Sequence, residues 1–139
     1  MYEIRLIPKE NIFDIIPLLQ VLDPKISAET LQERLTEMIT HNYQCVGVYD
    51  GQTLIGISGI WILYKYYVGK HLEADDVVIL PEYRSKGVGE QLSQWIDDYA
   101  RSQGCVAAEL NVYVGNKAGI RFWIRQGYNI LGFHCQKKF

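Results

Sequence analysis

The fold of this 139-residue chain is decided by one stretch, Val77-Val78-Ile79-Leu80-Pro81-Glu82-Tyr83-Arg84-Ser85-Lys86-Gly87-Val88-Gly89. An aliphatic run stops at Pro81 and apolar residues recur at helical spacing from Val88 onward, so the stretch predicts a strand, a loop and a helix. Two glycines one residue apart let the loop turn tightly, and the free N–H groups of a helix start attract anions. Arg84 and Lys86 add positive charge, which completes a predicted pyrophosphate cradle. The alternative is an ordinary turn with a helix cap and two solvated cations.

The rest of the chain supplies strands and helices on both sides of this loop. Asp50-Gly51 is a strong hairpin signal, because both central residues of the favoured turn have positive φ. Pro17 predicts a kink or break in the first helix, and Ser27 is the expected N-cap of the second. We expect strands over residues 2–7, 43–49, 53–63, 71–80 and 106–114 and from 128 onward, with helices over 12–22, 27–39, 87–103 and 116–126. This order predicts a single α/β domain, residues 1–139, with one mixed sheet covered on both faces.

Composition and charge narrow the classes of function. With 48% hydrophobic and 22% charged residues the chain has a globular composition, and its length suits one domain. The formal net charge of −2 lacks the basic field of a protein that binds nucleic acid or an anionic membrane, so we expect neither partner. Cys45, Cys105 and Cys135 form no C-x-x-C pair, which argues against a metal site. Without a signal-like segment or a run of about 20 apolar residues, a cytoplasmic location is expected.

Two motifs resemble those of a known family. Residues 84–89, RSKGVG, resemble the R/Q-x-x-G-x-G/A motif of the GNAT superfamily of acyl-CoA-dependent N-acyltransferases. Residues 116–128, NKAGIRFWIRQGY, are similar to its N-x-x-A-x-x-x-Y-x-x-x-G-F stretch. The expected order of elements matches the whole GNAT fold, a central, largely antiparallel mixed sheet of about six or seven strands with about four helices on both faces. The resemblance implies an N-acetyltransferase that uses acetyl-CoA, without a metal, in a ternary complex with its amine.

The resemblance also implies where acetyl-CoA binds. The strand through Val77 to Ile79 would be bulged and would separate from the strand through residues 109–114, and the pantetheine arm would pair with its backbone in that gap. The pyrophosphate would lie on the N–H groups of residues 85–90. Asn116 would bond the arm, unless it is only a helix N-cap, and Trp123 would form a wall beside it. The expected cofactor-binding residues are Val77, Val78, Ile79, Arg84, Ser85, Lys86, Gly87, Val88, Gly89, Glu90, Asn116 and Trp123.

The amine needs a base, because an ammonium of pKa about 10 must lose a proton before it attacks. Glu73 is the first candidate, since its distance from the glycine loop resembles that of a glutamate used by several GNAT enzymes, and Asp75 is the second. Without a bulge, Glu73, Asp75, Val77 and Ile79 share one face of the strand and Asp76 points to the other. Neighbouring buried carboxylates should have raised pKa values, although any one of them could equally form a structural ion pair.

The departing thiolate has no obvious acid. GNAT enzymes often have a tyrosine in the helix after the Asn position, where this chain has Trp123, and an indole cannot donate that proton. The nearby hydroxyls are those of Tyr128, Tyr113 and Tyr83, with Tyr128 the third catalytic candidate beside the two carboxylates. Alternatively the thiol leaves unassisted, at the modest cost of its pKa of about 8.5.

The acceptor is expected to be cationic. Tyr64, Tyr66 and Tyr67 cluster ahead of the carboxylate strand, where they either line a pocket for an amine or simply pack a strand end. The sequence leaves open a small-molecule or a peptide amine, and a monomer or a homodimer. A second hypothesis, favoured by Trp123 in place of the usual tyrosine, is a non-catalytic domain that senses acyl-CoA or mediates assembly. The carboxylate strand favours the enzyme.

Overall fold

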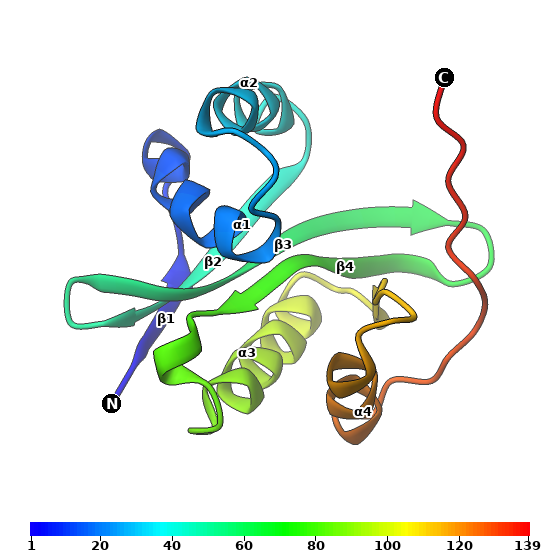
Figure 1. Cartoon of the computed structure of the whole chain (residues 1–139). Coiled ribbons are helices and arrows are strands. Elements are labelled where there is room, and N and C mark those ends of the chain that lie inside the picture. Colours follow the sequence, from blue (N-terminus) through cyan, green and yellow to red (C-terminus); the bar gives the residue numbers. More distant parts are fainter.

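A mixed five-stranded sheet lies at the centre of the structure, a computed structural model that describes residues 1–139 (Figure 1). Its strands, in spatial order, are β1 (Glu3–Leu6), β2 (Tyr43–Asp50), β3 (Thr53–Lys65), β4 (Gly69–Ile79) and β5 (Ala107–Leu110). Strands β1 to β4 pair with one another in antiparallel fashion, and β5 runs parallel to β4. The predicted α/β class and the mixed, largely antiparallel sheet are confirmed, with slightly fewer strands than expected.

Local signals in the sequence account for the first half of the fold. Gly51 has φ +60° in the tight turn between β2 and β3, so the predicted hairpin is confirmed. Three helices precede it in the chain and cover one face of the sheet: η1 (Lys9–Ile15, a 3-10 helix), α1 (Ile16–Leu22) and α2 (Ala28–Met38). Pro17 lies in the first turn of α1, where a missing N–H costs nothing, so the predicted break is the junction of η1 and α1. The Ser27 hydroxyl accepts the N–H of Thr30 at 3.1 Å and caps α2 as predicted.

The opposite face of the sheet is covered by α3 (Val88–Ser102), which follows the short 3-10 helix η2 (Pro81–Tyr83). Its buried stripe, Val88, Leu92, Ile96 and Ala100, packs on β2, β3 and β4 and forms a second core, separate from the core beneath α1 and α2. Helix α4 (Lys117–Arg125) lies on the α3 side of the sheet (Figure 1). The chain therefore has one apolar layer on each face of the sheet.

The C-terminal segment, residues 128–139, is not part of the sheet. The prediction of a last strand or hairpin there is therefore wrong for this structure. The strand predicted over residues 106–114 is also shorter, Ala107–Leu110, because the chain turns away from β4 beyond Leu110 and has no other strand to pair with. Both differences lie at the β5 edge.

Strand β4 contains a bulge. In its register with β3, Val78 pairs with Ile57 and Asp75 with Gly59, so two β4 residues oppose one β3 residue between these pairs. Asp76, one of the two, has φ +49°, a left-handed conformation that is uncommon for a residue with a side chain. The bulge that the family resemblance implied is thus present, and it begins one residue earlier, at Asp76.

The bulge changes which side chains share a face. Val78 packs in the core beneath α1 and α2, whereas Val77 and Ile79 pack against the α3 core. The single face expected for Glu73, Asp75, Val77 and Ile79 in a strand without a bulge therefore ends at Asp75, because the extra residue reverses the alternation. Asp76 therefore lies within the bulge itself and not on the face opposite Glu73 and Asp75, where a regular strand would place it.

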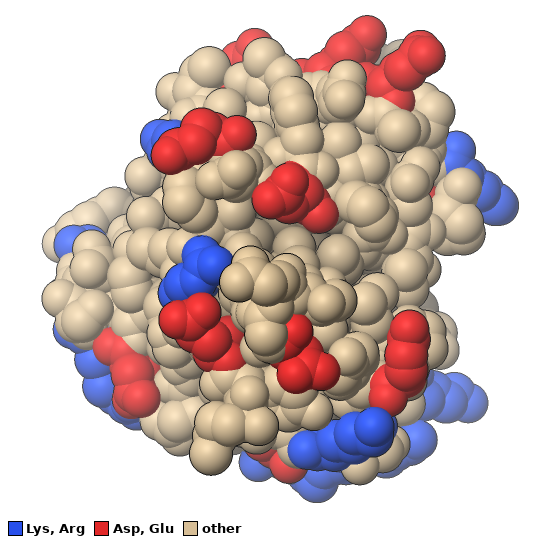
Figure 2. Space-filling view, turned by 90° about the vertical axis from the view of Figure 1, so that its left-hand side faces the viewer, with Lys and Arg blue, Asp and Glu red and all other residues tan.

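Charges are distributed without a dominant sign. On the face shown in Figure 2, acidic and basic side chains are interspersed among neutral atoms and neither kind forms one continuous patch. This agrees with the formal net charge of −2. None of the helices combines the length and the apolar character that crossing a bilayer requires.

Candidate functional site

Strands β4 and β5 separate partway along their length. Their parallel pairing ends at Ala74 and Leu110, yet β4 continues to Ile79 with only β3 beside it. The backbone of residues 75–79 is therefore open on the side from which β5 has turned away. An extended ligand can pair with such an edge as an added strand does.

The glycine loop presents a run of unused backbone donors next to this open edge. None of the N–H groups of residues 85–90 has an acceptor within the chain, and the first N–H of α3 that does is that of Gln91, 3.2 Å from the Gly87 carbonyl oxygen. Ser85 has φ +61° and Gly87 has φ +80°, left-handed conformations of the kind found in anion-binding nests. The donors also lie at the positive end of the α3 dipole. The loop is thus built to bind an anion.

The two glycines of the loop serve different purposes. A Cβ at Gly89 would lie 3.1 Å from the Phe122 ring, so the absence of a side chain lets α4 pack on the start of α3. A Cβ at Gly87 would meet nothing closer than the Glu90 carboxylate at 3.8 Å. Gly87 is therefore required by its backbone conformation and not by crowding.

The loop also carries two cations, Arg84 and Lys86. Arg84 donates from Nε to the Ile79 carbonyl at 2.9 Å, which leaves its terminal N–H groups free for an anion, and Lys86 holds its ammonium 5.7 Å from the centre of the Tyr83 ring. The Tyr83 hydroxyl donates to Asp50 at 2.8 Å, and this bond raises the pKa of Tyr83. Of the three hydroxyls predicted as proton donors to the thiolate, that of Tyr83 is therefore already bonded to Asp50 and does not point into the gap between β4 and β5.

Two adjacent carboxylates lie where β4 bulges. The Asp76 N–H donates to Asp75 Oδ1 at 3.0 Å, and Asp75 Oδ2 accepts the indole N–H of Trp61 at 3.3 Å. Burial, followed by the charge of Asp75, raises the pKa of Asp76 to about 7. Asp76 is therefore the carboxylate with the pKa that a base working near neutrality needs. Asp76 was not among the predicted catalytic residues. The Asp75-Asp76 pair was the available signal in the sequence, but its meaning depends on the bulge.

An unused hydroxyl lies against the same bulge. Tyr43 is fully buried, and its hydroxyl has no hydrogen-bond partner. It lies 2.8 Å from the position that a Cβ on Gly59, the β3 partner of Asp75, would occupy. Burial raises the pKa of Tyr43, with smaller contributions from Cys45 and the two aspartates, so the hydroxyl stays protonated. Sequence reasoning did not identify this residue.

Glu73 lies in a closed network of charges. Its Oε2 is 3.1 Å from Lys65 Nζ and 3.0 Å from Nε2 of the fully buried His71. Burial alone would raise the pKa of Glu73, but the hydrogen bonds from His71 and Lys65 outweigh it and lower the pKa. The expectation of a raised pKa for Glu73 is therefore wrong, and its geometry is that of the structural ion pair named as the alternative.

Glu109 completes this network from β5. Its Oε1 accepts the Tyr67 hydroxyl at 2.6 Å and lies 3.7 Å from His71 Nε2. His71, Glu73 and Glu109 are the residues whose ligand atoms, all within 4.8 Å of one another, could surround a metal ion. The Lys65 ammonium and the His71 ring already contact these carboxylates. Burial lowers the pKa of His71, but its bonds to Glu73 and Gly69 outweigh this effect and raise the pKa.

Helix α4 carries the remaining predicted site residues. Asn116 Oδ1 accepts the Gly119 N–H at 3.0 Å, so Asn116 is the N-cap of α4. Trp123 is half-buried and packs edge-on against Tyr128, with ring centres 5.4 Å apart. Burial raises the pKa of Tyr128 to about 12, so its hydroxyl retains its proton at neutral pH. Tyr113, the other predicted hydroxyl, is exposed.

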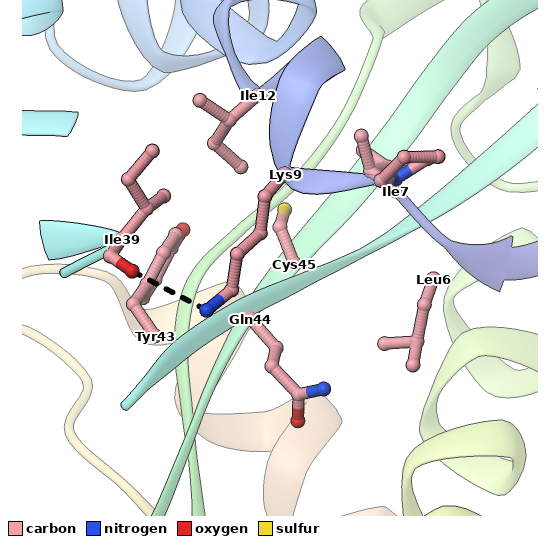
Figure 3. A pocket seen from close by; sticks show the side chains of 9 residues that line it. Leu6, Ile7, Lys9, Ile12, Ile39, Tyr43, Gln44 and Cys45 are labelled. Carbon is pink, nitrogen blue, oxygen red and sulfur yellow. Dashed lines mark hydrogen bonds between the residues drawn. The ribbon is translucent and has the colours of Figure 1, made fainter. Parts of the chain in front are cut away.

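The predicted tyrosine cluster is not a buried pocket. Tyr64 and Tyr66 are almost fully exposed at the end of the β3–β4 hairpin, and Tyr67 is half-exposed above Glu109. A cavity of about 350 Å³ lies elsewhere, between η1 and β2 (Figure 3). Lys9 donates to the Ile39 carbonyl at 3.3 Å beside it, and most of its lining is apolar. None of its lining residues was among the predicted site residues.

Comparison with known proteins gives one family. A model described as the acetyltransferase (GNAT) family matches residues 12–128. The uncharacterised N-acetyltransferase YhdJ of Bacillus subtilis is 25% identical over 96% of this chain and 95% of its own. A thialysine N-epsilon-acetyltransferase of Mus musculus is 23% identical over 55% of this chain and 45% of its own. Apart from YhdJ, the chain spans about half the length of the curated relatives it matches.

The fold recurs in solved structures. An aminoglycoside N-acetyltransferase in complex with CoA superimposes with a TM-score of 0.86 over 100% of this chain and 95% of its own, at 15% identity. At that identity the likeness concerns the fold alone. The fold and the family expected from residues 84–89 and 116–128 are both confirmed.

Proposed function

Because the chain belongs to the acetyltransferase (GNAT) family, we propose that it transfers an acetyl group from acetyl-CoA to a primary amine by direct attack in a ternary complex. The observation that carries the proposal is the run of free N–H groups over residues 85–90, placed beside an open strand edge. A diphosphate and an amide-containing arm match these two features. Residues 1–139 would act as one catalytic domain in the cytoplasm.

The donor would lie along the gap between β4 and β5. Its pyrophosphate would accept the N–H groups of residues 85–90, assisted by Arg84 and Lys86, and its pantetheine arm would pair with the backbone of residues 77–79. The Ile79 carbonyl already accepts Arg84, so the arm would use the groups that remain on this edge. Asn116 and Trp123, at the start and in the body of α4, would flank the arm.

The Asp75–Asp76 pair would remove the proton from the amine. The pKa of Asp76, about 7, lets the pair accept a proton near neutrality, whereas the pKa of Glu73 is lowered by its partners. We therefore place Asp76, supported by Asp75, ahead of Glu73 as the base. A backbone N–H near Val78 would hold the oxyanion. The thiolate would take its proton from Tyr128 or leave unassisted.

The acceptor would be a small-molecule or peptide amine that carries positive charge. Glu73, Asp75 and Glu109 line the sheet on the face away from α3, with the exposed tyrosines at the hairpin end beyond them. The names of the relatives agree in kind, since thialysine, aminoalkylphosphonates and aminoglycosides are all amines.

Release of free thiol from acetyl-CoA, measured over a panel of amines, tests the function. We expect release that depends on the amine, with diamines and basic peptides favoured over neutral amines. Tight binding of acetyl-CoA without release for any amine would instead support the non-catalytic alternative, a domain that senses acyl-CoA.

Trp123 gives a graded prediction for the wall of the cofactor gap. Trp123→Phe should keep most of the activity, because the indole supplies no proton, and Trp123→Ala should raise the Kd of acetyl-CoA more than it lowers kcat. Trp123→Ala should destabilise the fold by less than the about 3–5 kcal/mol that removing a fully buried ring costs, because Trp123 is only half-buried. Calorimetry and steady-state rates separate the two effects. A large loss of kcat in Trp123→Phe at unchanged Kd would contradict the wall.

A further inference from the structure

The cavity between η1 and β2 exists because the first strand is shorter than its neighbour. Strand β1 pairs with β2 only as far as Leu6 and Val46, whereas β2 extends beyond this pair to Tyr43. Pro8, which has no N–H to donate, turns the chain away from β2 and into η1. The space beside the start of β2 is the cavity of about 350 Å³, on the face of the sheet that α1 and α2 cover. Its volume is near the lower end of the range for small-molecule sites.

The inside of this cavity carries a hydroxyl that the protein leaves unpaired. Tyr43 lines the cavity, its side chain is fully buried, and its hydroxyl has no hydrogen-bond partner. In Figure 3 this hydroxyl points from β2 toward Ile12, on the same side of the strand as the Cys45 thiol. The thiol is only a weak acceptor, and it donates to the Val46 carbonyl at 3.7 Å. An unpaired buried donor is costly, so an acceptor brought by a ligand would be bound favourably there.

A cation lies at the mouth of the same cavity. Lys9 is exposed, and its Nζ donates to the Ile39 carbonyl at 3.3 Å, which leaves two of the three ammonium donors free. None of the ion pairs in the structure includes Lys9. The wall around the ammonium and the Tyr43 hydroxyl is mainly apolar, with Ile7, Ile12 and Ile39 among its residues (Figure 3). The cavity therefore presents two separate donors, one exposed and one buried, in an apolar wall.

We propose that this cavity binds a small aliphatic carboxylic acid that carries a second oxygen acceptor, such as a keto group, near the far end of its chain. The carboxylate would pair with the Lys9 ammonium at the mouth, and the second oxygen would accept the Tyr43 hydroxyl inside. The hydrocarbon between the two oxygens would cover the isoleucines of the wall. A flexible chain can adjust its length to two donors at fixed positions.

The other groups at the cavity agree with a singly charged ligand that has no donor of its own. The Gln44 side chain points to the opposite face of the sheet, where its Oε1 accepts the Tyr99 hydroxyl at 2.9 Å. Ile39 is the C-cap of α2, so the mouth lies at the negative end of that helix dipole. A carboxylate therefore fits better there than a doubly charged phosphate. The proposal is independent of acetyl transfer, because β3 separates β2 from β4 and its cofactor gap.

Calorimetry with two matched acids tests the proposal. The first is octanoate with a keto group on its penultimate carbon, and the second carries a methyl group in place of the keto oxygen. We expect the wild type to bind the keto acid about 10-fold more tightly, equivalent to about 1.4 kcal/mol, because only the keto oxygen can accept the Tyr43 hydroxyl. In Tyr43→Phe the two acids should bind with equal affinity.

The variants separate contact with the ligand from damage to the fold. Tyr43→Phe keeps the ring and removes a hydroxyl that has no partner, so its Tm should equal or exceed that of the wild type. Lys9→Met should weaken both acids by a similar factor, about 2–5-fold as for an exposed ion pair, and should keep the preference for the keto acid. Lys25→Met, at an exposed lysine between α1 and α2, is the matched control and should bind both acids normally.

The proposal is overturned if neither acid binds, or if the wild type binds both with equal affinity. A preference for the keto acid that persists in Tyr43→Phe would also overturn it, because another group would then be the donor. The same titrations in saturating CoA should give unchanged Kd values. Displacement of the keto acid by CoA would mean that the acid lies in the cofactor gap, which contradicts the proposal. All of these measurements report binding, so a chain without acetyltransferase activity leaves the test intact.

Discussion

Replacing Gly87 with glutamate is expected to abolish acetyl-CoA binding. The position has φ +80° and open space around it, so the new side chain would enter the volume that the pyrophosphate requires and place a negative charge there. Six neighbouring N–H groups would then face a carboxylate instead of the ligand. Calorimetry should show the Kd rising by roughly 100-fold or more, which corresponds to at least about 2.8 kcal/mol.

The control for this variant is Gly104→Glu at the end of α3. Gly104 has φ +79° and also has open space around it, so the substitution imposes the same backbone strain away from the loop. Both variants should lose a similar amount of stability, as read from Tm, but Gly104→Glu should bind acetyl-CoA normally. Equal Kd values in the two variants would remove the glycine loop from the site.

Asp76→Asn should lower kcat by about 10²–10⁴-fold, the usual contribution of a general base. The amide keeps the size of the side chain and cannot accept the proton. Glu73→Gln, which alters an ion pair next to the site, should cost less kcat. In the wild type the rate should rise with pH through an apparent pKa near 7, and that inflection should disappear in Asp76→Asn. A larger loss in Glu73→Gln would return the role of base to Glu73.

The pH dependence of the stability of Asp76→Asn distinguishes a lost catalytic group from damage to the fold. The pKa of Asp76 is about 7 in the folded chain, against about 3.9 for an unfolded aspartate, so folding favours the protonated form. The stability from that difference is complete below the unfolded pKa and is lost as pH rises from about 4 to about 7. Asp76→Asn avoids this loss, so its Tm relative to wild type should increase across that range. A gain in Tm at pH 8 with an unchanged kcat would make Asp76 a strained residue without a catalytic role.

The parts of the fold that the sequence predicted are those with local causes. The turn at Gly51, the cap at Ser27 and the loop before α3 each depend on a few adjacent residues. The bulge at Asp76 could not be located, because it arises from the register between β3 and β4. Its position reversed the faces of Val77 and Ile79 and thereby changed which carboxylate faces the core.

The pKa of Glu73 was missed for a related reason. Lys65 comes from β3 and His71 from two residues earlier on β4, and only the folded sheet brings both to one carboxylate oxygen. The C-terminal segment is a different case. The alternation at Leu131 and Phe133 is typical of a strand, but a strand also needs a neighbour to pair with, and in the structure this segment has none.

The parallel pairing of β4 with β5 affects the order in which the chain folds. The hairpins β2–β3 and β3–β4 close through short loops, whereas β5 meets β4 only after the whole crossover through α3 has formed. We therefore expect the antiparallel strands to form early, and the four-residue β5 with α4 to dock late and to detach first. A cofactor held between α3, β4 and α4 would connect the early unit to the late one. By holding these elements together, the bound cofactor would slow unfolding from the β5 and α4 side of the molecule.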